Sequence, residues 1–174
     1  RLTGSRADLM ILDEIEVPPY FPDTPKVRES LAKMYANIEH NDRRLGEILA
    51  ELEEDGLAEN TAVFIWTDHG PMPRGKRWPY DSGIRSPMIV RWPGKVKAGS
   101  VTDAMVEYVD VTPTFIDAAG GQPVAPVDGR SFLPVLEGRA QRHKEQVFGI
   151  MTTRGIINGT DAYAIRSVRE ERYK

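Results

Sequence analysis

The feature that most constrains the fold is a long amphipathic segment followed, after a short turn, by a brief run of almost purely apolar residues. Residues 25–54 repeat apolar side chains at helical spacing, which predicts a helix with one buried face. Residues 61–67 (TAVFIWT) are rich in β-forming side chains, which is typical of a strand buried on both faces of a parallel sheet. Helix, turn and buried strand form half of a βαβ unit. We therefore expect an α/β fold with part of a mixed or parallel central sheet flanked by helices.

Both ends of the expected helix carry boundary signals. The proline-rich residues 17–25 should run extended, with Thr24 as the N-cap and Pro25 at the first helical position. Gly56, after Asp55, is placed to end the helix in a left-handed conformation. Asp42 falls on the apolar stripe, and a carboxylate there needs a partner if it is buried. We interpret it as a structural hydrogen-bond acceptor rather than a catalytic group.

The remaining sequence predicts shorter elements separated by glycine and proline. In chain order they are a second buried strand at 87–92, a surface turn at 95–100, a short helix capped by Asp110 or Thr112 and stopped by Gly120-Gly121, a loop at 121–131, one helical turn at 132–137, and strands at 147–151 and 162–168 around an Asn158-Gly159 turn.

Composition excludes several kinds of protein. The 174 residues are 40% hydrophobic and 28% charged, which is typical of a globular domain. A net charge of −3, with acids and bases interspersed, gives no reason to expect nucleic-acid or membrane binding. The absence of cysteine excludes disulfides and thiolate metal sites within these residues. Because the sequence begins at Arg1 without a signal peptide and ends in a charged run, we expect a piece of a longer protein.

The chemistry is expected where the strand at 61–67 ends. Ligands bind outside the carboxyl ends of strands in open α/β sheets, and here Asp68, His69 and Gly70 follow at once. A carboxylate and an imidazole can bind a divalent cation, while the glycine allows a sharp turn and a close approach to a ligand. Taken alone, this tripeptide is more often a plain turn than a metal site.

The loop that follows adds positive charge. Residues 71–80 (PMPRGKRWPY) place Arg74, Lys76 and Arg77 within four residues. Beside a metal site such a loop can bind an oxyanion such as sulfate or phosphate. It is equally compatible with a solvated basic loop, so both interpretations stay open at this point.

Several segments together resemble a known family. TAVFIWTDHG, GKRWPYDSGIRSPMIVRWPGKV and VDVTPTFIDAAG resemble the central and C-terminal part of the sulfatases, which belong to the alkaline-phosphatase superfamily. The stretch VPPYFPDTPKVRESLAKMYANIEHNDRRLGEIL, the loop PMPRGKRWPYDSGIR and the ending TTRGIINGTDAYAIRSVREERYK are similar to the heparan N-sulfatase, or sulfamidase-like, branch. The resemblance covers residues 17–174.

The resemblance implies roles for individual residues. Asp68 matches the metal-binding aspartate of the family, which usually holds Ca²⁺, and His69 matches a neighbouring metal contact. Lys76 matches the catalytic basic residue that contacts the sulfate group. Arg85 matches a position of the family that is expected to be structural. Arg77 and Tyr80, with Trp78, have weaker matches and are expected to line the substrate mouth.

The resemblance also implies groups outside this sequence. The formylglycine nucleophile, made from the cysteine of a Cys-x-Pro-x-Arg motif, and two further acidic metal ligands are expected upstream. Asp8 and Asp13 lie in no recognisable metal motif. We therefore expect the complete protein, periplasmic or secreted, to hydrolyse sulfuric esters or N-sulfates of a small molecule or glycan, and this chain alone to be inactive. Residues 1–140 are expected to belong to the catalytic domain and 141–174 to begin a C-terminal subdomain.

Two alternatives stay open. One is a phosphatase or phosphonate monoester hydrolase of the same superfamily, whose binuclear site needs a further histidine. His40 is expected to face solvent, and His143 lies in a charged, surface-like run. The other is a non-catalytic domain that binds sulfated glycans through the basic loop. Substrate, O- versus N-sulfate preference and oligomeric state are not fixed by the sequence, and Asn158-Gly159-Thr160 fits a glycosylation acceptor.

Overall fold

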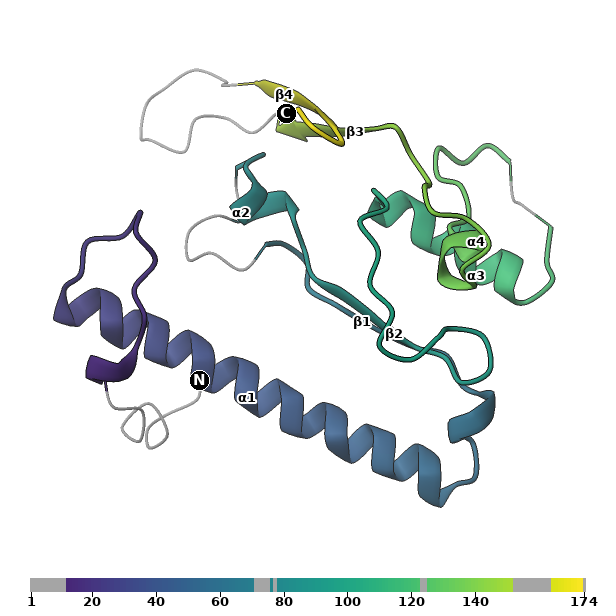
Figure 1. Cartoon of the computed structure of the whole chain (residues 1–174), viewed down its shortest axis with the longest axis horizontal. Helices are drawn as coiled ribbons and strands as arrows, with labels where there is room; N and C mark the ends of the chain where they lie inside the picture. The colour runs from purple at the N-terminus through teal and green to yellow at the C-terminus, as the bar shows by residue number, and fades with distance from the viewer. Residues whose placement is uncertain (1–11, 71–75, 77, 123–124, 152–163, 174) are drawn as a thin grey trace. The chain divides into compact units, whose positions relative to one another are not determined.

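The computed structural model describes residues 12–70, 76, 78–122, 125–151 and 164–173. The chain divides into two compact units, residues 1–58 and 59–174 (Figure 1). The described residues contain both helices and short strands, which agrees with the predicted α/β class. The expected domain boundary at residue 140 is a different division and stays a prediction.

The first unit is built on one long helix, α1 (Pro25–Glu54), preceded by the short turn η1 (Leu12–Glu14). Thr24 caps the helix, since its Oγ1 accepts a hydrogen bond from the backbone N–H of Val27 at 3.3 Å. The helix ends just before Gly56, whose φ is 69°. Both predicted ends are therefore confirmed, and they were predictable because the capping chemistry is local.

The core of this unit lies at the N-terminal half of α1. Ile15, Leu31 and Ala32 are buried there. The guanidinium of Arg28 ties the preceding turn to the helix by donating to the carbonyl oxygen of Ile15 at 3.0 Å. Ile38, further along the predicted apolar stripe, is exposed, and so is Asp42, which therefore does not need the buried partner considered for it.

In the second unit β1 (Val63–Trp66) pairs antiparallel with β2 (Met88–Arg91), with Phe64 opposite Val90. Both strands lie where the sequence predicted them. The expectation of parallel, fully buried strands is wrong for this pair, because the described sheet has two strands and neither is enclosed. Trp66 and Ile89 are exposed, while Phe64 packs edge-on against Phe115 with the ring centroids 4.8 Å apart.

The rest of the unit follows the predicted order closely. Its other elements are η2 (Ala58–Asn60), α2 (Asp81–Ile84), η4 (Tyr108–Asp110), α3 (Val111–Ala118), α4 (Leu133–Leu136), β3 (Gln146–Met151) and β4 (Ile165–Glu170). The strands β3 and β4 pair antiparallel, with Phe148 opposite Val168. The expected turn and glycosylation motif at Asn158-Gly159 lie outside the described residues. None of the helices in the described ranges is long and apolar enough to cross a membrane.

Candidate metal and sulfate site

Three of the predicted site residues meet just beyond the end of β1. The Nζ of Lys76 donates a hydrogen bond to Oδ2 of Asp68 at 2.5 Å, and Nε2 of His69 lies 3.6 Å from Oδ1 of the same carboxylate. The Asp68 and Lys76 side chains are about two-thirds exposed and His69 is about one-third exposed. The imidazole and the ammonium thus both lie next to the carboxylate, at a site that solvent can reach.

The hydrogen bonds of Asp68 and His69 suit cation binding. Nδ1 of His69 lies 2.6 Å from the carbonyl oxygen of Gly70, which can only accept a hydrogen bond. The neutral imidazole therefore carries its proton on Nδ1, which leaves the lone pair of Nε2 on the side of Asp68. The hydrogen bond from Lys76 holds the pKa of the Asp68 carboxyl below its usual range, so the carboxylate is ionised at neutral pH.

The separation of the two candidate ligands also fits a shared ion. A carboxylate oxygen and a neutral imidazole nitrogen would both bind a divalent cation. The observed distance between Oδ1 of Asp68 and Nε2 of His69 is 3.6 Å. Within the described parts of the chain no group of three or more His, Cys, Asp or Glu side chains is placed so that it could hold a metal ion. The pair therefore fits part of a ligand set.

Gly70 holds the turn that carries these residues against α2. Its N–H donates to the carbonyl oxygen of Gly83 at 3.1 Å. A Cβ at position 70 would lie 2.5 Å from the carbonyl oxygen of Ser82 and 2.6 Å from that of Asp81. Gly70 was predicted to allow a close approach to a ligand; in the structure it approaches the backbone of α2, and any side chain there would force the two segments apart.

Three of the other residues that the sequence singled out, Trp78, Tyr80 and Arg85, lie within the described residues. Tyr80 is exposed and lies beside Trp78, with the ring centroids 6.3 Å apart. Arg85 is exposed and follows the last residue of α2. Arg74 and Arg77 lie outside the described residues.

Three hydroxyl groups beside the cluster were missed by the sequence reasoning. The hydroxyls of Ser86 and Tyr108 donate hydrogen bonds to the carbonyl oxygen of Thr67, the residue before Asp68. The hydroxyl of Thr67 lies beside that of Ser86. The position of Thr67 next to Asp68 was a usable signal. Nothing in the sequence marks Tyr108, which is 41 residues away from its partner Thr67.

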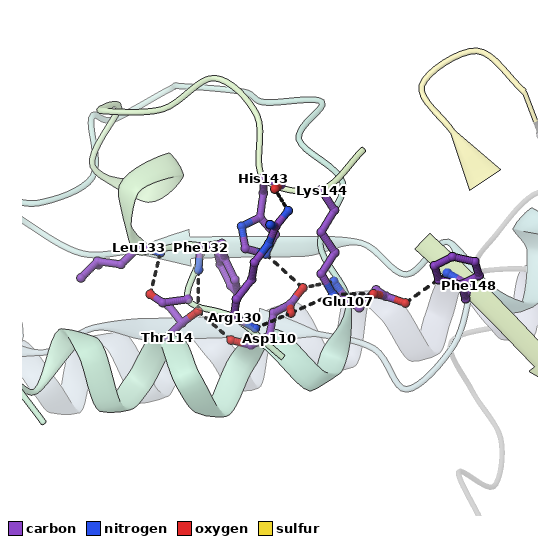
Figure 2. A network of polar contacts seen from close by, with 10 residues as sticks. Glu107, Asp110, Thr114, Arg130, Phe132, Leu133, His143, Lys144 and Phe148 are labelled. Atoms are coloured by element: carbon purple, nitrogen blue, oxygen red, sulfur yellow. Dashed lines mark hydrogen bonds and ion pairs between the residues drawn. The ribbon is translucent and has the colours of Figure 1, made fainter. Parts of the chain in front are cut away.

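A second polar network lies within the same unit and is centred on a buried carboxylate, that of Asp110 (Figure 2). The carboxylate of Asp110 is fully buried and accepts hydrogen bonds from the backbone N–H groups of Glu107 at 2.9 Å and Arg130 at 3.0 Å. Lys144 pairs with both Asp110, at 2.9 Å, and Glu107. Asp110 occupies the predicted N-cap position of α3, but its side chain bonds to these groups instead of capping the helix.

His143 belongs to this network, so the prediction of a surface position is wrong. Its side chain is 5% exposed, and Nε2 lies 3.2 Å from Oδ2 of Asp110 without making a hydrogen bond. The charged neighbours in the sequence misled the prediction, because Lys144 is itself drawn inward by Asp110. Since its members face one another, we interpret the network as a structural connection between η4, the loop before α4 and the segment before β3.

Burial and pairing act in opposite directions on these groups. Burial alone would raise the pKa of Asp110, but Lys144 and the two backbone N–H groups outweigh it and hold that pKa below its usual value. Burial, together with the positive charges of Arg130 and Lys144, holds the pKa of His143 below its usual value against the raising effect of Asp110. The pKa of Lys144 is raised, because the two carboxylates outweigh the effect of burial.

Two family models match the chain. The sulfatase model matches residues 13–121, and the model of the C-terminal part of N-sulphoglucosamine sulphohydrolase matches residues 69–174. The chain belongs to the sulfatase family. Membership implies a divalent metal and a formylglycine in general. The formylglycine would lie outside this chain, which has no cysteine to supply it.

The relatives agree with this assignment. An ulvan-active sulfatase from Formosa agariphila is 37% identical over 92% of this chain and 26% of its own length. Human N-sulphoglucosamine sulphohydrolase is 32% identical over 92% of this chain and 33% of its own length. The chain therefore spans about a quarter to a third of these relatives.

Solved structures support the same fold. A phosphonate monoester hydrolase from Silicibacter pomeroyi superposes with a TM-score of 0.71 at 25% identity, over 95% of this chain and 38% of its own. A protein in complex with its substrate D-glucosamine-2-N,6-O-disulfate superposes with a TM-score of 0.68 at 27% identity, over 83% of this chain and 30% of its own.

Proposed function

We propose that the complete protein carrying this chain hydrolyses sulfuric esters or N-sulfates on a sulfated glycan. The observation that carries the proposal is that Asp68, His69 and Lys76 meet beyond β1 in a chain of the sulfatase family. The choice of a glycan is supported by relatives named for ulvan and N-sulphoglucosamine, and by the structural neighbour bound to a disulfated glucosamine.

Each residue has a defined task in this proposal. Asp68 and His69 hold a divalent cation, proposed to be Ca²⁺, which when bound withdraws charge from the sulfuryl oxygens and activates the nucleophile supplied by the formylglycine. Lys76 donates a hydrogen bond to the sulfuryl group or to the leaving oxygen, where negative charge builds in the transition state. Arg77 and Tyr80 bind the remainder of the substrate.

A second candidate is phosphonate or phosphate monoester hydrolysis. It is favoured by the similarity to the phosphonate monoester hydrolase structure. An imidazole beside a carboxylate also suits manganese or zinc, which binuclear phosphoesterases use, as well as the oxygen-preferring calcium. Substrate preference and metal content therefore separate the two candidates.

The test uses the longest natural protein that contains this chain. Its rates on N-sulfoglucosamine, 4-nitrophenyl sulfate and a phenyl phosphonate monoester are compared, and its metal content is measured by mass spectrometry. Faster cleavage of a sulfate or sulfamate with one calcium per molecule supports the proposal. A preference for the phosphonate with two transition-metal ions supports the second candidate. Binding of sulfated glycans without any cleavage would indicate a non-catalytic protein instead.

A further inference from the structure

We propose that the hydroxyl groups of Thr67, Ser86 and Tyr108 are positioning groups that aim Asp68 and His69 at the cation. The inference rests on the proposed function, because it requires a cation at this site. It concerns residues from three separate segments of the second unit: the residue after β1, the residue two before β2, and η4.

The first part of the argument is the peptide that joins Thr67 to Asp68. The carbonyl oxygen of this peptide accepts hydrogen bonds from the Ser86 hydroxyl at 2.6 Å and from the Tyr108 hydroxyl. A carbonyl oxygen has two lone pairs, so both are occupied by side-chain donors. The plane of the peptide directly before Asp68 is therefore fixed from two sides.

The second part is the peptide that follows His69. The hydroxyl of Thr67 has one proton, and it donates this proton to the carbonyl oxygen of His69 at 2.6 Å. The same hydroxyl lies 2.8 Å from that of Ser86, which also accepts from the Thr67 N–H at 3.3 Å. Main-chain groups on both sides of the two candidate ligands are thus held by hydroxyls.

This support matters because the Asp68 side chain is largely exposed and has little packing against the described residues around it. The Asp68 side chain is 67% exposed, and its one hydrogen-bonded side-chain partner in the described residues, Lys76, is 63% exposed. The backbone therefore sets the direction in which the carboxylate leaves the chain. Groups that orient metal ligands typically change metal affinity by about 10- to 100-fold when they are removed.

The experiment measures cation affinity in the complete protein, independently of turnover. The protein is stripped of metal and titrated with Ca²⁺ and, separately, Mn²⁺ by calorimetry. We expect Tyr108→Phe and Ser86→Ala each to weaken cation binding by about 10-fold or more, and Ser86→Thr, which keeps the hydroxyl, to recover most of the affinity. Tyr20→Phe removes a hydroxyl from an exposed tyrosine of the first unit and should bind like the wild type.

Two further readouts separate positioning from general stability. The thermal midpoint of the stripped protein should change little in Tyr108→Phe, whereas a merely structural role would lower it and leave the cation affinity of the folded protein unchanged. With substrate, kcat should fall at limiting Ca²⁺ and recover at saturating Ca²⁺. If Tyr108→Phe does not fold, the comparison of Ser86→Ala with Ser86→Thr decides.

The outcomes distinguish this inference from the proposed function. Wild-type cation affinity in both Tyr108→Phe and Ser86→Ala would overturn the positioning role alone. Equal weakening in the Tyr20→Phe control would overturn it as well. A wild-type protein that binds neither cation and cleaves no sulfate would overturn the positioning role and the proposed function together.

Discussion

Lys76 is the residue whose contribution to catalysis can be isolated most simply. Its ion pair with Asp68 joins two largely exposed side chains, and such pairs add little to stability. Lys76→Ala in the complete protein should therefore fold normally, while kcat falls by roughly 100-fold or more, the usual loss for one transition-state donor. Lys95→Ala, which removes the same charge from an exposed turn, should leave kcat unchanged. A normal kcat in Lys76→Ala would place that ammonium outside the reaction.

Gly129 shows how tightly single positions are packed around Asp110. A Cβ at this position would collide with the carbonyl group of Val109. Gly129→Ala should therefore cost about 1–3 kcal/mol of unfolding free energy, as overpacked sites do. Gly46→Ala is the matched control, because a Cβ there, on α1, meets nothing within 4 Å. It should stabilise α1 by roughly 0.5–1 kcal/mol, through helix propensity. Urea unfolding measures both changes, and equal signs would contradict this account.

At the residue scale, the sequence could predict groups that are close along the chain but not those brought together by folding. Asp68 and His69 are adjacent and Lys76 follows eight positions later, so one motif contains all three. Tyr108 and Ser86 carry no local pattern, and only the tertiary structure brings their hydroxyls to the Thr67 carbonyl. His143 was misplaced for the same reason, because its burial depends on a carboxylate 33 residues away.

At the scale of elements, position was predictable and pairing was not. The limits of α1 follow from capping groups within a few residues of each end, which is local chemistry. The strands β1 and β2 were also located, but their antiparallel pairing was not foreseen. An apolar run indicates a strand without saying which neighbour it pairs with or how fully it is covered.

Lys144 connects the segment before β3 to η4 through its ion pairs with Glu107 and Asp110, and the contribution of this connection to stability can be measured. Its side chain is 12% exposed and lies between the carboxylates of Asp110 and Glu107. Lys144→Met leaves the fully buried Asp110 without its ammonium partner, which should cost about 3 kcal/mol in unfolding free energy. Lys97→Met, at an exposed position, should change it by about 0.5 kcal/mol or less.

A double variant tests whether this loss comes from the pairing itself. Adding Asp110→Asn to Lys144→Met removes the buried charge that was left without its partner. The double variant should therefore lose less stability than the sum of the two single variants, since the two positions are in contact. Strictly additive losses would show that Lys144 contributes through packing and not through its charge.

For the whole molecule, the α/β class and the family were predictable, because motifs spread over most of the chain agree with one another. The chain spans about a quarter to a third of the relatives' length, and the catalytic activity proposed above is that of the complete protein. In that proposal Asp68 and His69 supply only part of the ligand set, because two donors are fewer than a calcium ion takes.

The pH dependence of stability is set by buried groups that titrate in different ranges. The folded-state pKa values of His143 and Asp110 both lie below their ordinary values of about 6.5 and 3.9. Below each ordinary value the unfolded chain binds protons more readily than the folded one, so stability falls on acidification. Lys144 has a raised pKa, so its contribution persists through neutral pH and is lost only at strongly alkaline pH.

We therefore expect a first loss of stability as the pH falls below about 6.5, with a slope of at most about 1.4 kcal/mol per pH unit for the one proton on His143. We expect a second loss below about pH 4, as Asp110 is protonated. Thermal unfolding of the complete protein across this range, followed by hydrogen exchange in residues 107–114, measures both. His143→Gln should abolish the first loss and keep the second, whereas His40→Gln, which replaces an exposed histidine, should keep both. If His143→Gln lost as much stability as the wild type between pH 7 and pH 5, the buried imidazole would not be the group that titrates, because its neutral folded form is what makes stability fall in this range.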